Sequence, residues 1–131
     1  FRRFTAPAAD VAAGLRAIVA TDPRAVFVVH SHYDHLPDIT AVAKQTNATI
    51  FGTESTLNVA RGGTVPADQL KLLAAGETHV IGEFTVTAIA SPHSVVPSHN
   101  EPATPTIPEP LELPASSKAL AEGGNFDFVV K

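Results

Sequence analysis

Four potential metal ligands lie within six consecutive residues, and this cluster is the strongest chemical signal in the sequence. Segment 30–35 contains His30, His32, Asp34 and His35, and the chain has no cysteine. Imidazole nitrogens and carboxylate oxygens are the ligands that zinc takes when thiolates are absent. A lone histidine is usually an ordinary core or surface residue, but unselected loops rarely combine three histidines and an aspartate at this spacing. The segment therefore predicts a metal site for one or two zinc ions, with iron or manganese as alternatives.

The elements around this cluster are expected to place its side chains at one edge of a sheet. Residues Ala25–Val29 form a continuous β-branched and aromatic run, which is typical of a strand buried on both faces in a parallel sheet. His30 would follow the C-terminal end of that strand. A helix over 37–47 and a short strand at 49–51 would complete a β-α-β order. The sequence thus predicts an α/β fold with the cluster in a strand-to-helix loop.

The remaining pattern fits a single domain over residues 1–131. Helices are expected over 8–20 and 54–60, and strands over 70–73, 78–90 and 126–131. Segment 94–114 is rich in proline, which excludes regular structure and favours an extended lid or an ordered surface strap. A further helix is expected over 115–122, before the Gly123-Gly124 break.

Composition narrows the class of protein and of substrate. The 131 residues are 44% hydrophobic and 17% charged, which is ordinary globular usage. A net charge of -4 provides no basic face for a phosphate backbone, so we expect a small-molecule substrate and no nucleic acid. No stretch reaches the roughly 18 apolar residues that cross a bilayer, so we expect no membrane span. A cytoplasmic and an exported location both stay open.

The ligand cluster also resembles a known motif. The pattern His30-x-His32-x-Asp34-His35 after an apolar strand is similar to the signature of the metallo-β-lactamase fold superfamily. The likeness continues through the following helix and segment 51–56 to the Ser-Pro-His-Ser sequence at 91–94. It implies an αββα sandwich and a bacterial zinc hydrolase that uses metal-activated hydroxide on an ester, lactone, amide or phosphodiester.

The resemblance also implies the ligands of each metal ion, and the chemistry of the residues suggests further roles. His30, His32 and His93 would bind the first zinc, and Asp34 and His35 the second. Asp34 would orient the hydroxide or take a proton. Tyr33 would stabilise an oxyanion or serve only in packing. Ser31 and Ser94 would either hydrogen-bond to neighbouring ligands or simply fit tight loops, whereas His79 and His99 are expected to be solvated.

Part of the superfamily pattern has no counterpart in this sequence. The bridging aspartate and the final histidine of the family come from strands well beyond the third histidine; Asp127 lies inside a predicted strand and His99 follows His93 too closely. We therefore expect a fragment with largely the first half of the sandwich, without the first strands and the C-terminal half. Missing residues or another chain would supply the rest. The alternative function is a non-catalytic metal-binding or interaction fragment.

Overall fold

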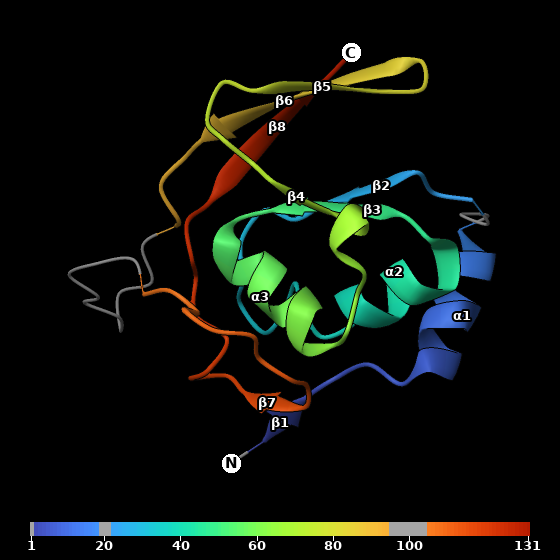
Figure 1. The fold of residues 1–131 in the computed structure, drawn as a ribbon, viewed down its shortest axis with the longest axis vertical. Coiled ribbons are helices and arrows are strands. Elements are labelled where there is room, and N and C mark those ends of the chain that lie inside the picture. Colours follow the sequence, from blue (N-terminus) through green and yellow to red (C-terminus); the bar gives the residue numbers. More distant parts are fainter. Residues whose placement is uncertain (1, 19–21, 95–104) are drawn as a thin grey trace.

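Two three-stranded sheets face each other, and helices cover the outer side of one of them (Figure 1). The structure is a computed structural model that describes residues 2–18, 22–94 and 105–131. These layers reproduce the helix, sheet and sheet of the expected αββα arrangement. Within the described ranges, no helix lies over the outer face of the second sheet.

The helix-covered sheet is parallel and carries the predicted β-α-β order. Its strands are β2 (Ala25–Phe27), β3 (Thr49–Gly52) and β4 (Leu70–Leu72), in the order β2-β3-β4. Helix α2 (Ile39–Thr46) connects β2 to β3, and α3 (Glu54–Gly62) connects β3 to β4. Both strand pairs are parallel, so the C-terminal ends of these strands lie at the same edge of the sheet.

The second sheet is antiparallel and has the order β5-β6-β8. Its strands are β5 (Thr78–Ile81), β6 (Phe84–Ala90) and β8 (Phe126–Val130). The expected strand region 78–90 is a hairpin, and Gly82 takes a φ of 61° in its turn, where glycine carries no steric penalty.

The chain passes from the first sheet to the second just before the ligand cluster. The Val28 amide still donates to the Phe51 carbonyl at 2.9 Å, whereas the Val29 carbonyl accepts from the Phe126 amide at 2.9 Å. Strand β2 therefore ends two residues earlier than expected, because Val29 is bonded to the start of β8. The loop that begins at His30 is fixed to both sheets.

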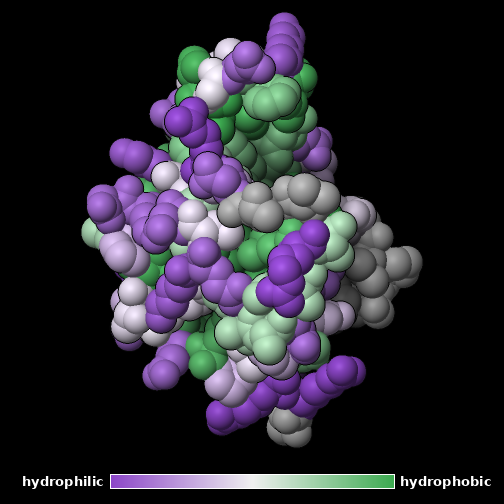
Figure 2. All heavy atoms as spheres, turned by 90° about the vertical axis from the view of Figure 1, so that its right-hand side faces the viewer, coloured by the Kyte–Doolittle hydropathy of each residue, from purple (hydrophilic) through white to green (hydrophobic). Residues whose placement is uncertain are grey.

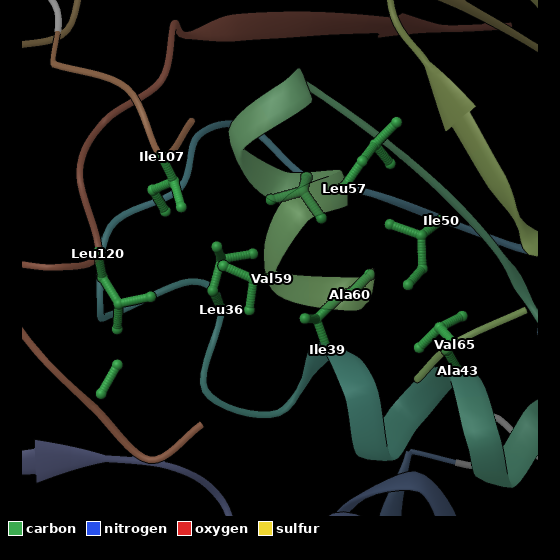
Figure 3. Close-up of a cluster of buried hydrophobic side chains, with 12 residues drawn as sticks. Leu36, Ile39, Ala43, Ile50, Leu57, Val59, Ala60, Val65, Ile107 and Leu120 are labelled. Carbon is green, nitrogen blue, oxygen red and sulfur yellow. The ribbon is translucent and has the colours of Figure 1, made fainter. Parts of the chain in front are cut away.

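Two hydrophobic cores hold these layers together. The first lies between the parallel sheet and the helices, and Figure 3 shows Leu36, Ile39, Ile50 and Leu120 pointing into it. Leu36 directly follows the ligand cluster and is fully buried, so the cluster is anchored in this core. The second core lies between the two sheets and consists of Phe51, Leu73, Ala88 and Phe126, with further aromatic rings packed around it.

Segment 105–114 is an irregular strap over α3. The Ile107 amide donates to Ser55 Oγ at 2.9 Å, and Asn58 Nδ2 donates to the Ile107 carbonyl at 2.8 Å. The Leu111 amide donates to the Asn58 carbonyl at 3.0 Å. These bonds fix the described part of the proline-rich segment to the helix; residues 95–104, the remainder of the proposed lid, lie outside the described residues.

The helix expected over 115–122 is wrong. Residues Ala115–Ser116 form β7, which pairs with β1 (Arg3–Phe4), and turns follow it. The first helix, α1 (Ala8–Ala17), is shorter than expected, and a 3-10 turn, η1 (Ala67–Gln69), precedes β4. Long-range contacts of segment 115–122 override its local helical pattern.

The outer part of the antiparallel sheet carries exposed apolar side chains. Val80, Phe84 and Val130 are 72%, 58% and 59% exposed, and Figure 2 shows hydrophobic residues gathered at the upper end of the molecule, where this sheet lies in Figure 1. No helix of the described chain is both long and apolar enough to cross a bilayer.

Candidate metal centre

The structure brings the five predicted ligands together in two groups that share one residue. One ligand atom from each of His30, His32 and His93 lies within 4.8 Å of the others, and the same limit holds for His30, Asp34 and His35. The sequence resemblance places His30 only at the first metal. The geometry additionally places it next to the ligand atoms of the second group.

His30 is the buried centre of this arrangement. It is 6% exposed, and the centroid of its ring lies 4.8 Å from that of His32, 4.2 Å from that of His35 and 4.6 Å from that of His93. Neither ring nitrogen of His30 has a hydrogen-bond partner among the described residues. Buried polar nitrogens without a partner are costly unless something binds them, so the ring fits a metal ligand.

His93 reaches the cluster from the other sheet. It follows β6, where the Ser91 amide donates to the Asn125 carbonyl at 3.1 Å and Asn125 Nδ2 donates to Ser91 Oγ at 2.7 Å. His93 Nδ1 donates to the Ser94 carbonyl at 2.9 Å. Because that bond holds the proton on Nδ1, Nε2 keeps its lone pair for a metal ion.

Asp34 and His35 lie at the exposed side of the cluster. A helical turn follows His32, because the amides of His35 and Leu36 donate to the His32 carbonyl at 3.0 and 3.2 Å. His35 Nε2 lies 3.6 Å from Asp34 Oδ2. The second group is therefore more open to solvent than the first, as a position that admits water requires.

The surroundings keep the His30 imidazole neutral. Burial is the main cause that lowers its pKa from 6.5 to about 4, and repulsion from His35, His32 and His93 adds to the lowering. The Asn125 side chain opposes the shift, although it does not reach hydrogen-bonding geometry with either ring nitrogen. A neutral imidazole is the form that binds a metal ion, so the donor set fits zinc, iron or manganese.

Acid is expected to destabilise the metal-free chain between pH 6.5 and about 4. In this window the unfolded chain protonates His30 and the folded chain does not, so the unfolded state binds more protons and the free energy of unfolding falls as pH falls. Urea unfolding across the window measures the slope. The His30→Gln variant should show a shallower slope, and an equally steep one would contradict this assignment.

Tyr33 contacts an aromatic residue near the start of the chain. Its ring lies 4.6 Å from that of Phe4, centroid to centroid, and it is 44% exposed. This contact supports the packing interpretation, and a role in oxyanion stabilisation stays a prediction.

The two serines beside the ligands are bonded in different ways. Ser31 Oγ bonds to Thr53 and Thr56, and Ser94 contacts His93 through its backbone carbonyl. The sequence analysis did not identify Asn125, although a polar residue directly before a predicted strand could have drawn attention to it. Thr53 and Thr56 were not identified as partners of Ser31 either.

His79 and Asp127 belong to neither ligand group. His79 is packed against Phe51, with ring centroids 4.8 Å apart, and its side chain is 18% exposed, so the expectation of a solvated side chain is wrong. His99 lies outside the described residues. Asp127 is inside β8, opposite Ile89, on the face away from the second core.

A cavity of about 590 Å³ lies beside His93. Its lining includes the apolar residues Leu72, Leu73 and Phe126 and the acidic residues Glu54 and Glu122. No lysine or arginine is among its lining residues in the described part of the chain. The cavity is large enough for a small organic molecule.

Comparison with known proteins agrees with this geometry. The family model of the beta-lactamase superfamily domain matches residues 4–108. A UPF0173 metal-dependent hydrolase of Chloroflexus aurantiacus is 30% identical over 60% of this chain and 32% of its own length. One of Pyrobaculum calidifontis is 32% identical over 67% of this chain and 41% of its own length.

A solved structure shows the same fold. The metallo-β-lactamase SMB-1, bound to 2-mercaptoethanesulfonate, aligns with a TM-score of 0.51 and 28% identity, over 63% of this chain and 38% of its own. The chain thus spans about a third to two fifths of the length of these proteins. Because the family model covers most of the sequence, the chain belongs to the beta-lactamase superfamily.

Proposed function

We propose that this chain carries the metal centre of a metal-dependent hydrolase that acts on a small molecule. His30, His32 and His93 would hold one ion, and Asp34 and His35, close to His30, would hold a second. The observation that carries the proposal is the convergence of three histidines from the loops after β2 and β6, with one ligand atom of each within 4.8 Å of the others. The names of both curated relatives, metal-dependent hydrolases, support the same activity.

The residues around the centre would have different roles in hydrolysis. A bound zinc ion would supply Lewis acidity, which brings water toward a pKa of about 7 and polarises the substrate oxygen. The Asp34 carboxylate, at the open side, would orient the attacking oxygen or take its proton. Burial of the His30 ring and the bond from His93 Nδ1 to the Ser94 carbonyl would limit the movement of these two ligands. Tyr33 would donate to a developing oxyanion.

The acidic residues that line the cavity beside His93 favour a neutral or cationic substrate over a polyanion. Glu54 and Glu122 border it, although Glu54 is paired with Arg61. Esters, lactones and amides of small acids fit this setting, and a small phosphodiester fits its size. Nucleic acid does not fit, because a phosphate backbone is bound mainly by lysine and arginine, and neither lines the cavity within the described chain.

Hydrolysis by the zinc-loaded chain is expected on a panel of small esters, lactones and phosphodiesters. The His32→Ala variant should lower kcat/KM by at least about 100-fold, since it removes one of three imidazoles from the ion that supplies the chemistry. Rate measurements on the native and variant chains, compared at equal metal content per chain, give this loss. Turnover that survives unchanged in the variant would refute the proposed centre, and strong activity on RNA or DNA with none on the panel would refute the substrate class.

A non-catalytic metal-binding or interaction fragment is the second candidate. It is favoured by the partial coverage, because the chain spans only 32% and 41% of the two curated relatives. The bridging aspartate and last histidine of the superfamily also have no match. This candidate predicts that the chain binds metal but hydrolyses nothing on the panel, whereas His32-dependent turnover would exclude it.

A further inference from the structure

Ser31 lies between two candidate ligands and is completely buried. It separates His30 from His32 in the sequence, and it has no exposed surface. A buried hydroxyl needs hydrogen-bond partners. Ser31 Oγ bonds to Thr53, which directly precedes α3, and to Thr56 in the first turn of that helix.

The three hydroxyls form a closed triangle. Ser31 Oγ lies 3.2 Å from Thr53 Oγ1 and 3.0 Å from Thr56 Oγ1, and the two threonine oxygens are 3.4 Å apart. Each hydroxyl has one proton and two lone pairs, so each can donate one bond and accept another within the triangle. Thr53 is also the N-cap of α3, because its Oγ1 accepts from the Thr56 amide at 3.3 Å.

The backbone of Ser31 is held from a second side. Its amide donates to the Glu122 carbonyl at 2.8 Å. Gly123 follows immediately and is packed so closely that an added Cβ would lie 3.2 Å from Ser31 Oγ. One residue of the ligand loop is therefore fixed to α3 by its side chain and to segment 122–123 by its main chain.

This double attachment matters because the His30 ring is not oriented by hydrogen bonds of its own. Both of its nitrogens lack partners within the described chain. Its position must come from the backbone and from packing. The best-defined backbone anchors beside it are Val29, bonded to β8, and Ser31.

We propose that the Ser31–Thr53–Thr56 triangle is a positioning device that holds the His30 and His32 backbone for metal binding. Ser31 would be a positioning residue that acts through its neighbours. The inference rests on the proposed metal centre, but it concerns residues that are not ligands. Loss of a group that hydrogen-bonds to a metal ligand typically lowers affinity by about 10–100-fold, and we expect an effect of the same order when the backbone between two ligands loses its anchor.

The test is metal binding by variants that each remove one hydroxyl. Ser31→Ala and Thr56→Val should each weaken zinc affinity by about 10–100-fold in competition titrations with a chromophoric chelator. They should also alter the visible absorption band of the cobalt-substituted chain. Thr56→Ser keeps the hydroxyl and should bind metal as the native chain does.

A matched control breaks a hydroxyl bond between two threonines that lie away from the metal centre. Thr78 and Thr87 share a hydroxyl bond of 2.8 Å on the outer face of the β5-β6-β8 sheet, so Thr78→Val should leave affinity and the cobalt spectrum unchanged. Urea unfolding of each metal-free variant corrects the affinities for any unfolded fraction. If Ser31→Ala does not fold, the zinc affinity of Thr56→Val decides whether the triangle positions the ligands.

The outcomes separate the two proposals. Native-like affinity and cobalt spectra in folded Ser31→Ala and Thr56→Val chains would overturn the positioning role and leave the metal centre intact. An affinity loss fully explained by unfolding would also overturn it. Failure of the native chain to bind zinc or cobalt would instead overturn the metal centre itself, before any variant is needed.

Discussion

Replacing His30 with alanine is expected to abolish metal binding at both positions of the centre. His30 is the residue that the two ligand groups share. Without it, the first group keeps two imidazoles and the second keeps Asp34 and His35, fewer than the three protein ligands of a typical catalytic zinc site. The affinity loss should exceed the roughly 10–100-fold caused by losing an outer partner.

Metal content per chain and zinc titration measure this effect. The His35→Ala variant should retain one ion, because His30, His32 and His93 remain. Asp38→Asn is the matched control, since Asp38 is exposed, three residues beyond His35 and in neither ligand group. Native stoichiometry in His30→Ala would show that His30 is not shared and is not required.

The ligand segment was predictable because its signals are local. A buried strand followed by histidines places His30 at a sheet edge, and the β-α-β order follows from the hydrophobic pattern alone. The structure confirms both, with β2 and β3 parallel and α2 between them. His93 comes from the antiparallel sheet, and only the family resemblance linked it to the cluster. No local pattern could show that the start of β8 bonds to Val29.

Segment 115–122 shows why the rest was not predictable. In a helix with 3.6 residues per turn, Ala115 and Leu120 would point roughly 140° apart. The structure buries both in the first core, which a single helix at the surface could not do. Ala115 pairs with Phe4, more than a hundred residues earlier. The segment's fold depends on distant partners that its own sequence does not reveal.

The partners of Ser31 were hidden for the same reason. A serine beside a ligand suggests a bond to that ligand, but its hydroxyl bonds to threonines 22 and 25 residues later in the sequence. In the sequence these threonines stand out only as part of segment 51–56, which belongs to the family resemblance. Their second role arises only because α3 begins beside the ligand loop, which the β-α-β order permits but does not specify.

Substitution of Gly123 by alanine is expected to destabilise the chain by about 2–5 kcal/mol. Gly123 has a φ of +71°, which costs an alanine roughly 1–2 kcal/mol. An alanine Cβ would also overlap the side chain of Ser55. Ser55 is 2% exposed, and its Oγ accepts from the Ile107 amide, so it cannot move away without breaking a buried bond. Such overpacking adds about 1–3 kcal/mol.

Gly76→Ala separates the backbone cost from the packing cost. Gly76 has a φ of +81° but nothing within 4 Å of an added Cβ, so this variant should lose only about 1–2 kcal/mol in urea unfolding. Gly123→Ala should also bind zinc more weakly, because the adjacent Glu122 carbonyl accepts from the Ser31 amide, whereas Gly76→Ala should bind it normally. Equal stability losses in the two variants would mean that Ser55 moves aside at little cost. Close packing against α3 would then not be the reason why position 123 needs glycine.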